Sequence, residues 1–136
     1  MIAAIEALER LRTGNLRFAN EGRNGAPTDA ARRRELAAGQ EPFAIILGCS
    51  DSRVPAEIIF DQGLGDLFVI RVAGNIVAPS QVGSVEFAAE KFGTRLVVVL
   101  GHSGCGGIQA TLEELGRRSG EQSPNLRSIV ARIRPA

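Results

Sequence analysis

The sequence predicts an α/β domain with a mainly parallel β-sheet flanked by helices. Three short runs at 43–47, 67–72 and 96–100 are rich in Val, Ile and Leu, and each is continuously apolar rather than alternating. Runs of this kind are typical of parallel strands that are buried on both faces. Helical patterns separate the runs, and such alternation favours a parallel sheet. We therefore expect three neighbouring parallel strands.

The other elements follow in chain order. An amphipathic helix is expected over 2–20, then a loop rich in Gly, Asn and Pro over 21–28, and a short helix over 29–38. Further helices are expected at 55–60, 80–92, 108–115 and 125–133, with Gly93 as a C-cap. On the apolar side of the helix at 80–92 we expect Val82, Val85, Phe87, Ala88 and Ala89.

Length and composition predict a single domain over 1–136, with an N-terminal helical arm at about 2–38 and a core at about 42–136. The 16 basic and 15 acidic side chains leave no charge excess that would favour nucleic acid. No apolar run approaches the roughly 20 residues that span a bilayer. The first residues also lack the pattern of a signal peptide, so we expect a cytoplasmic protein with no membrane partner.

Two polar, glycine-containing segments directly follow predicted strands: 48–55 (GCSDSRVP) and 101–107 (GHSGCGG). The carboxyl ends of parallel strands form sites at one edge of a sheet, so Cys49, His102 and Cys105 are expected to converge there. Two thiolates and one imidazole suit a tetrahedral Zn²⁺. Three protein ligands leave the fourth position open, which distinguishes a catalytic zinc from a structural one.

Two residues beside the first cysteine bear on that open position. Asp51 can either occupy it or accept a hydrogen bond from a hydroxide bound there, and Arg53 can hold the carboxylate off the metal through a charge-assisted fork. Gly106 lies where a helix begins. The free N–H groups at the start of that helix can accommodate an anion such as bicarbonate. We hypothesise that Asp51 and Arg53 act as a switch.

At these residues the chain resembles the β-class carbonic anhydrases: 49–55, 68–75 (FVIRVAGN) and 101–107 match the motifs of that family in order. The resemblance implies one zinc ion per chain on Cys49, His102 and Cys105, with Asp51 and Arg53 as the catalytic pair. It implies reversible hydration of carbon dioxide to bicarbonate and a proton, by attack of zinc-bound hydroxide. It also implies a homodimer or a larger homo-oligomer.

The resemblance extends to substrate contacts. Gln40, nine residues before the first cysteine, matches a glutamine that contacts substrate across the dimer interface. Phe68, Ala73 and Phe87 match positions that line the carbon dioxide pocket. Ile46 stands where members with a bicarbonate-regulated closed site carry tryptophan, which argues against that regulation. Family members run on for several dozen residues after the equivalent of Ala136, so we expect the family's C-terminal strand and helices to be lacking and one sheet edge to be unpaired.

Other interpretations of these residues remain open. Cys49 and Cys105 are alternatively a redox disulfide, and Asp51 and Arg53 a purely structural ion pair. Gln40 is alternatively a solvated loop residue. The alternative activities are hydrolysis of CS₂ or COS on the same fold, or no catalysis at all in a zinc-binding or assembly module.

Overall fold

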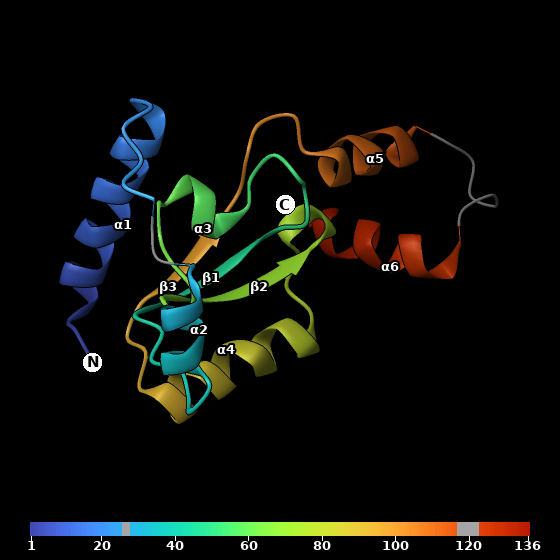
Figure 1. The fold of residues 1–136 in the computed structure, drawn as a ribbon. Helices are drawn as coiled ribbons and strands as arrows, with labels where there is room; N and C mark the ends of the chain where they lie inside the picture. Colours follow the sequence, from blue (N-terminus) through green and yellow to red (C-terminus); the bar gives the residue numbers. More distant parts are fainter. Residues whose placement is uncertain (26–27, 117–122) are drawn as a thin grey trace.

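The structure, a computed structural model, describes residues 1–25, 28–116 and 123–136. Residues 26–27, which belong to the loop expected at 21–28, lie outside the described part of the chain. Strands β1 (Ala44–Cys49), β2 (Leu67–Val72) and β3 (Val97–Leu100) form one sheet in the order β2-β1-β3. Both neighbouring pairs are parallel. The predicted α/β class and parallel sheet are therefore confirmed (Figure 1).

Helices cover the two faces of the sheet (Figure 1). Helix α1 (Ala4–Ala19) and the short α3 (Ala56–Ile59) lie on one face, where Leu11 packs with Ala44 and Ile46 of β1. Helix α4 (Pro79–Phe92) lies on the other face, where Ala88 packs with Ile45 of β1. Since side chains alternate along a strand, β1 contributes to both layers and is buried along its whole length.

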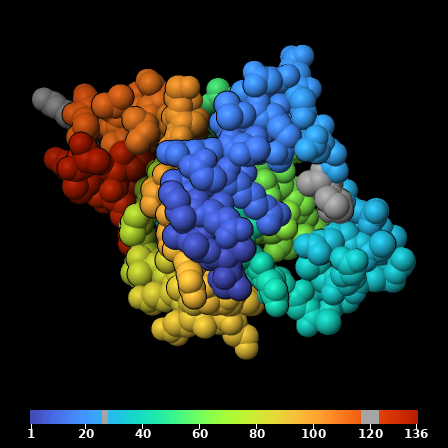
Figure 2. Space-filling model, turned by 90° about the vertical axis from the view of Figure 1, so that its left-hand side faces the viewer, coloured from blue at the N-terminus to red at the C-terminus, as the bar shows by residue number. Residues whose placement is uncertain are grey.

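Side-chain caps and turn residues explain where several helices begin and end. Asp29 caps α2 (Ala30–Leu36) by accepting from the backbone N–H of Arg32, and Ser123 caps α6 (Pro124–Ile133) in the same way. Gly93 ends α4 in the left-handed conformation, with φ of 65°, as its position predicts. Figure 2 shows α1, in blue, lying across the surface beside the orange segment that contains β3.

The remaining elements gather at the carboxyl end of the sheet (Figure 1). A single 3-10 turn, η1 (Ala73–Asn75), directly follows β2. Helix α5 (Gly106–Leu115) follows β3 and packs against both α6 and η1. Because α5 begins at Gly106 rather than at the predicted residue 108, the second motif runs straight into its first turn.

The expectation that all three strands are buried on both faces is wrong for β3. Val97 and Val99 are 44% and 61% exposed, although their partners in β1 are buried. The register places both valines on the face that α4 covers, but α4 packs mainly against β1 and β2, so both side chains stay exposed. Of the side chains expected on the apolar side of α4, Ala88 is buried and Val85 is partly buried, whereas Phe87 is 52% exposed and Val82 and Ala89 are also exposed.

Candidate metal centre

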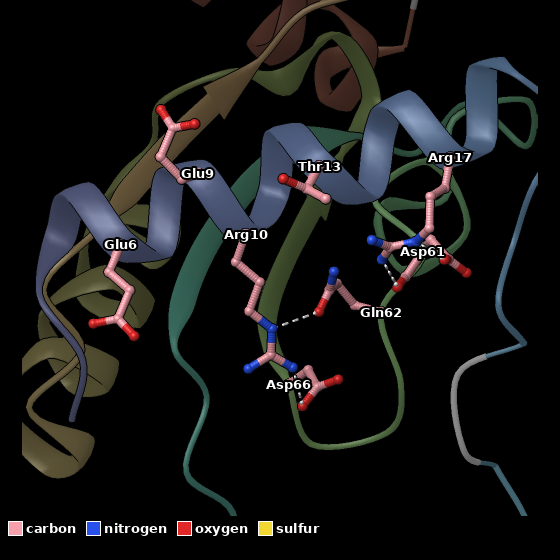
Figure 3. A pocket seen from close by; sticks show the side chains of 8 residues that line it. All are labelled: Glu6, Glu9, Arg10, Thr13, Arg17, Asp61, Gln62 and Asp66. Carbon is pink, nitrogen blue, oxygen red and sulfur yellow. Dashed lines mark hydrogen bonds and ion pairs between the residues drawn. The ribbon is translucent and has the colours of Figure 1, made fainter.

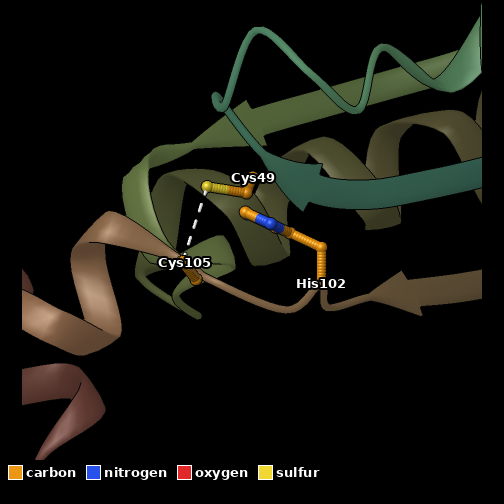
Figure 4. Close-up of side chains that lie close together, drawn as sticks. All are labelled: Cys49, His102 and Cys105. Atoms are coloured by element: carbon orange, nitrogen blue, oxygen red, sulfur yellow. Dashed lines mark hydrogen bonds between the residues drawn. The ribbon is translucent and has the colours of Figure 1, made fainter.

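Three side chains, one from the end of β1 and two from the turn after β3, meet at the carboxyl end of the sheet (Figure 4). Cys49 is the last residue of β1, whereas His102 and Cys105 lie in the turn between β3 and α5. One potential ligand atom from each side chain lies within 4.8 Å of the others, and the two Sγ atoms are 3.9 Å apart. Both cysteines are buried and neither forms a disulfide. The structure thus brings together the three predicted ligands.

The imidazole of His102 is held in one tautomer. Its Nδ1 lies 2.9 Å from the carbonyl oxygen of Ser103, so Nδ1 carries the hydrogen and donates it. In the neutral ring Nε2 then carries the lone pair, and this buried atom has no hydrogen-bond partner among the described residues. Buried polar atoms normally have partners, so an unpartnered nitrogen beside two sulfurs fits a group that can bind a metal ion.

This arrangement fits a zinc ion. Two sulfurs at about 2.3 Å from a tetrahedral zinc lie about 3.8 Å apart, close to the spacing of the two Sγ atoms. Burial by itself raises the pKa of the Cys49 thiol, but His102 and the backbone N–H groups of Asp51 and Gly74 outweigh that effect and bring the pKa down to about 7. The same contact with Cys49 raises the pKa of His102. The environment therefore favours the thiolate that a zinc ligand requires.

Close backbone packing between two glycines brings the two cysteines together. Gly74 adopts φ of 72° and its N–H donates to Cys49 Sγ at 3.3 Å. A Cβ on Gly107 would lie only 2.9 Å from Cα and 3.0 Å from N of Gly74. The first turn of α5, which follows Cys105, can come this close to η1 because Gly107 has no side chain, whereas a Cβ on Gly74 would clash with Ile133 instead.

Asp51 and Arg53 form the predicted pair beside the three ligands. The Arg53 guanidinium donates to both carboxylate oxygens of Asp51, at 2.8 and 2.6 Å, and also to the carbonyl oxygen of Gly104 at 2.9 Å. These contacts with Arg53 hold the pKa of Asp51 well below its usual range and raise that of Arg53. Asp51 Oδ2 stands 3.8 Å from His102 Nε2, so the carboxylate lies beside the ligand set while Arg53 holds it.

Arg71 also contacts this site, and sequence reasoning gave it no role. From β2 its Nε donates to the carbonyl oxygen of Cys49 at 2.9 Å, and its terminal nitrogen to that of Asp51 at 2.7 Å. The sequence did contain a signal for such a role, because Arg71 is the only charged residue in the otherwise apolar strand β2, which pairs with β1.

The structure places two of the predicted substrate residues next to the ligand set. Gly106 lines a cavity of about 350 Å³ together with His102, Cys105 and Ile108. Ala73, exposed, precedes Gly74 in η1. Their roles toward substrate remain predictions.

The other three lie apart from the three ligands. Phe68 and Phe87 pack with Phe92 on the α4 face of the sheet, with ring centroids 5.7 to 6.1 Å apart. Gln40 lines a different hollow, beside Leu36 and Leu64. Because Gln40 is predicted to act in a partner subunit, its position in one chain leaves that prediction untested.

Comparison with known proteins agrees with this site. Residues 44–136 match the sequence model of the carbonic anhydrase family. Carbonic anhydrase 2 of Mycobacterium tuberculosis is 44% identical, and the match covers 97% of this chain and 63% of the relative. A carbonic anhydrase of Mycolicibacterium smegmatis is also 44% identical, over 97% of this chain and 64% of its own length. The chain therefore spans somewhat less than two thirds of the length of these relatives.

Solved structures show the same fold. The β-carbonic anhydrase CafA of Aspergillus fumigatus is 28% identical with a TM-score of 0.67, covering 96% of this chain and 58% of its own. A tetrameric β-carbonic anhydrase of Sordaria macrospora is 27% identical with a TM-score of 0.68, over 96% of this chain and 64% of its own. Together with the family match and the identity to the mycobacterial enzymes, these likenesses show that the chain belongs to the β-class carbonic anhydrases.

Proposed function

We propose that this chain catalyses the reversible hydration of carbon dioxide to bicarbonate and a proton, as a carbonate dehydratase with one Zn²⁺ held by Cys49, His102 and Cys105. The observation that carries the proposal is the bare, buried Nε2 of His102 beside two sulfurs 3.9 Å apart. Family membership supports the reaction, since the mycobacterial relatives are named carbonic anhydrases.

A zinc ion bound there supplies a Lewis acid that lowers the pKa of water in its open position toward about 7. The chain's own residues prepare that position. The lowered pKa of Cys49 favours a thiolate ligand, and the bond from Nδ1 to the Ser103 carbonyl aims Nε2 at the sulfurs. His102 is the only histidine in the sequence, so none is left over to carry protons away.

Asp51 and Arg53 act in this proposal as a gate. With both carboxylate oxygens bound by Arg53, Asp51 stays ionised and stands off the metal position, where it can accept a hydrogen bond and orient the attacking oxygen. If the pair opened, the freed Asp51 carboxylate would be able to serve as a further ligand of the ion. The intact pair in this structure supports the open arrangement.

Substrate would lie in the cavity beside His102, where Ile108 offers an apolar wall for carbon dioxide. The first N–H groups of α5, at Gly106 and Gly107, have no partners within the helix and suit an anionic product. We assign Ala73 to the substrate side of this chain's own site, and Phe68, Phe87 and Gln40, which lie apart from its three ligands, to the site of a partner subunit. The last assignment requires a homodimer or larger homo-oligomer.

The assembly proposal has two supports. The Sordaria macrospora relative is tetrameric, and this chain exposes large apolar side chains on β3 and α4. No helix in the described part of the chain has the length and apolar character needed to cross a membrane. A cytoplasmic location remains a prediction from the sequence.

Stopped-flow measurement of carbon dioxide hydration together with zinc content tests the proposal. We expect one zinc per chain in the wild type, and loss of zinc and of activity by at least about 100-fold in Cys105→Ser, because first ligands matter at least as much as their supporting groups. Ser103→Ala is the matched control: it keeps the backbone carbonyl that orients His102, and both readouts should stay within about 2-fold of wild type.

Two outcomes would contradict the proposal. Zinc at one per chain with no hydration above the uncatalysed rate would indicate a binding or assembly module. Faster turnover of CS₂ or COS than of carbon dioxide, in parallel assays on the same zinc-loaded sample, would indicate the hydrolase alternative.

A further inference from the structure

We propose that Arg71 is a positioning residue that fixes the turn after β1 and thereby sets where Asp51 stands relative to the metal ligands. The inference rests on the proposed function, because it concerns the residue that orients the reacting oxygen. Arg71 touches no substrate or ligand atom in this proposal and acts only through the backbone of Cys49 and Asp51.

The turn after β1 has little other backbone support. The ladder between β1 and β2 ends at the pair Cys49 and Val72, with one further bond from the Ser50 N–H to the Val72 carbonyl at 3.2 Å. Beyond this point Asp51 has left the sheet. Its carbonyl oxygen accepts from the Arg71 side chain at 2.7 Å and from the backbone N–H of Val54 at 3.1 Å.

The single guanidinium group of Arg71 donates hydrogen bonds to two backbone carbonyls that are two residues apart. Nε of Arg71 binds the oxygen of Cys49, and a terminal nitrogen of the same planar group binds the oxygen of Asp51. A rigid fork with fixed donor directions can hold both peptides in one relative orientation, which a flexible ammonium group cannot do. The peptide that carries a metal ligand and the peptide that carries the gate are thus joined to β2 by one side chain.

Two arginines then restrain Asp51 through different groups. Arg71 holds its carbonyl and anchors it to β2, whereas Arg53 holds its carboxylate and anchors it to Gly104, in the turn that carries the other two ligands. The 3.8 Å separation of Asp51 Oδ2 from His102 Nε2 follows from both restraints. Loss of Arg71 would leave the Asp51–Arg53 pair and its contact with Gly104 intact, but would release the carbonyl group of Asp51 from β2.

The test compares zinc-loaded wild type with Arg71→Gln and Arg71→Lys. We expect Arg71→Gln to lower kcat/KM about 10- to 100-fold at full zinc occupancy, as removal of groups that support metal ligands does. The kcat/KM of Arg71→Lys should lie between those of wild type and Arg71→Gln, because an ammonium group can hydrogen-bond well to one of the two carbonyls but not to both. Arg95→Gln is the control, since Arg95 is exposed and forms no hydrogen bond or ion pair within the described residues; it should leave kcat/KM unchanged.

Two further readouts separate positioning from general support of the fold. Low millimolar guanidinium should restore part of the activity of Arg71→Gln and leave wild type unaffected. With Co²⁺ in place of zinc, the visible spectrum, which reports ligand geometry, should differ between Arg71→Gln and wild type and return toward wild type with guanidinium. Thermal unfolding checks that the variants are folded.

Unchanged kcat/KM and an unchanged Co²⁺ spectrum in folded Arg71→Gln would overturn the inference. The inference would also be overturned if Arg71→Gln unfolded at a lower temperature than wild type and guanidinium did not restore its lost kcat/KM. If Arg71→Gln does not fold, Arg71→Lys carries the same comparison, and wild-type kcat/KM in that variant would equally overturn it. Absence of hydration by wild type itself would instead refute the proposed function, and the Co²⁺ spectra would still test whether Arg71 orients the site.

Discussion

At the scale of single residues, the metal centre depends on one close backbone contact, which requires Gly107 to lack a side chain. Gly74 and Gly107 contact each other through their backbones, and this contact brings the turn that holds Cys105 toward the turn that presents an N–H to Cys49. The side chains that would bind the metal are therefore distinct from the residues whose packing brings them together. A methyl group at this contact should disturb zinc binding without altering any ligand.

Gly107→Ala tests this directly. Because the new Cβ would lie 2.9 Å from a backbone atom of Gly74, the variant should lose about 1–3 kcal/mol of stability and bind zinc more weakly. Gly106→Ala is the matched control: it adds the same methyl one residue earlier, where nothing lies within 4 Å, and should be neutral or slightly stabilising. Urea unfolding and competition with a chelator measure the two effects. Equal stability and equal zinc affinity in the two variants would argue against the contact.

At the scale of elements, helix α1 is held on the sheet by apolar packing and by a partly buried ion pair. Figure 3 shows Arg17 of α1 reaching Asp61, which follows α3; Nε of Arg17 lies 2.6 Å from the carboxylate. The backbone N–H of Asn24 donates to the same oxygen at 3.1 Å, and Gly14 of α1 lies so close to Phe60 that a Cβ there would overlap its carbonyl. Asp61 therefore joins the N-terminal arm to the core.

This junction predicts a dependence of stability on pH. The hydrogen bond from Arg17, assisted by that from Asn24, holds the pKa of Asp61 below its usual range. The carboxylate therefore contributes stability above the unfolded pKa of about 4, and that contribution is lost as the pH falls through the lower folded value. In urea unfolding at pH 7, 5 and 3, Asp61→Asn should be less stable than wild type at pH 7, and the difference should shrink toward pH 3.

Glu90→Gln provides the comparison for this experiment. Glu90 is exposed on α4 and forms no ion pair in the part of the chain that the structure describes. The stability of the Glu90→Gln variant should therefore equal that of wild type at each pH. A gap between wild type and Asp61→Asn that stays constant from pH 7 to pH 3 would show that the Asp61 carboxylate is not the group involved.

At the scale of the whole molecule, the apolar surface that remains exposed favours self-association. Val97 and Val99 on β3 and Phe87 on α4 are 44%, 61% and 52% exposed. An exposed strand with apolar side chains is a template for further pairing and packing. The proposed role of Gln40 in a neighbouring site requires the same kind of assembly.

We accordingly expect multi-angle light scattering to show a mass of at least twice the 14.4 kDa of one chain. Val99→Lys places a charge on the exposed face of β3 and should shift the mass toward that of a monomer. Val99→Ile keeps the face apolar and should retain the assembly. A wild-type mass of one chain at tens of micromolar would contradict both the assembly and the assignment of Gln40.

The sequence by itself determined the elements and the ligand chemistry of this protein. The continuous apolar runs identified the three strands, and the residue types at Cys49, His102 and Cys105 predicted a soft, three-ligand metal site, because periodicity and donor character are local properties of the chain. The tertiary structure decided what depends on partners distant in sequence. The strand order leaves Val97 and Val99 exposed, and the contact of Gly74 with Gly107 brings the two cysteines together. Arg71 reaches from β2 to the turn after β1. None of these can be deduced from local pattern, since each depends on which segments lie side by side once the chain has folded.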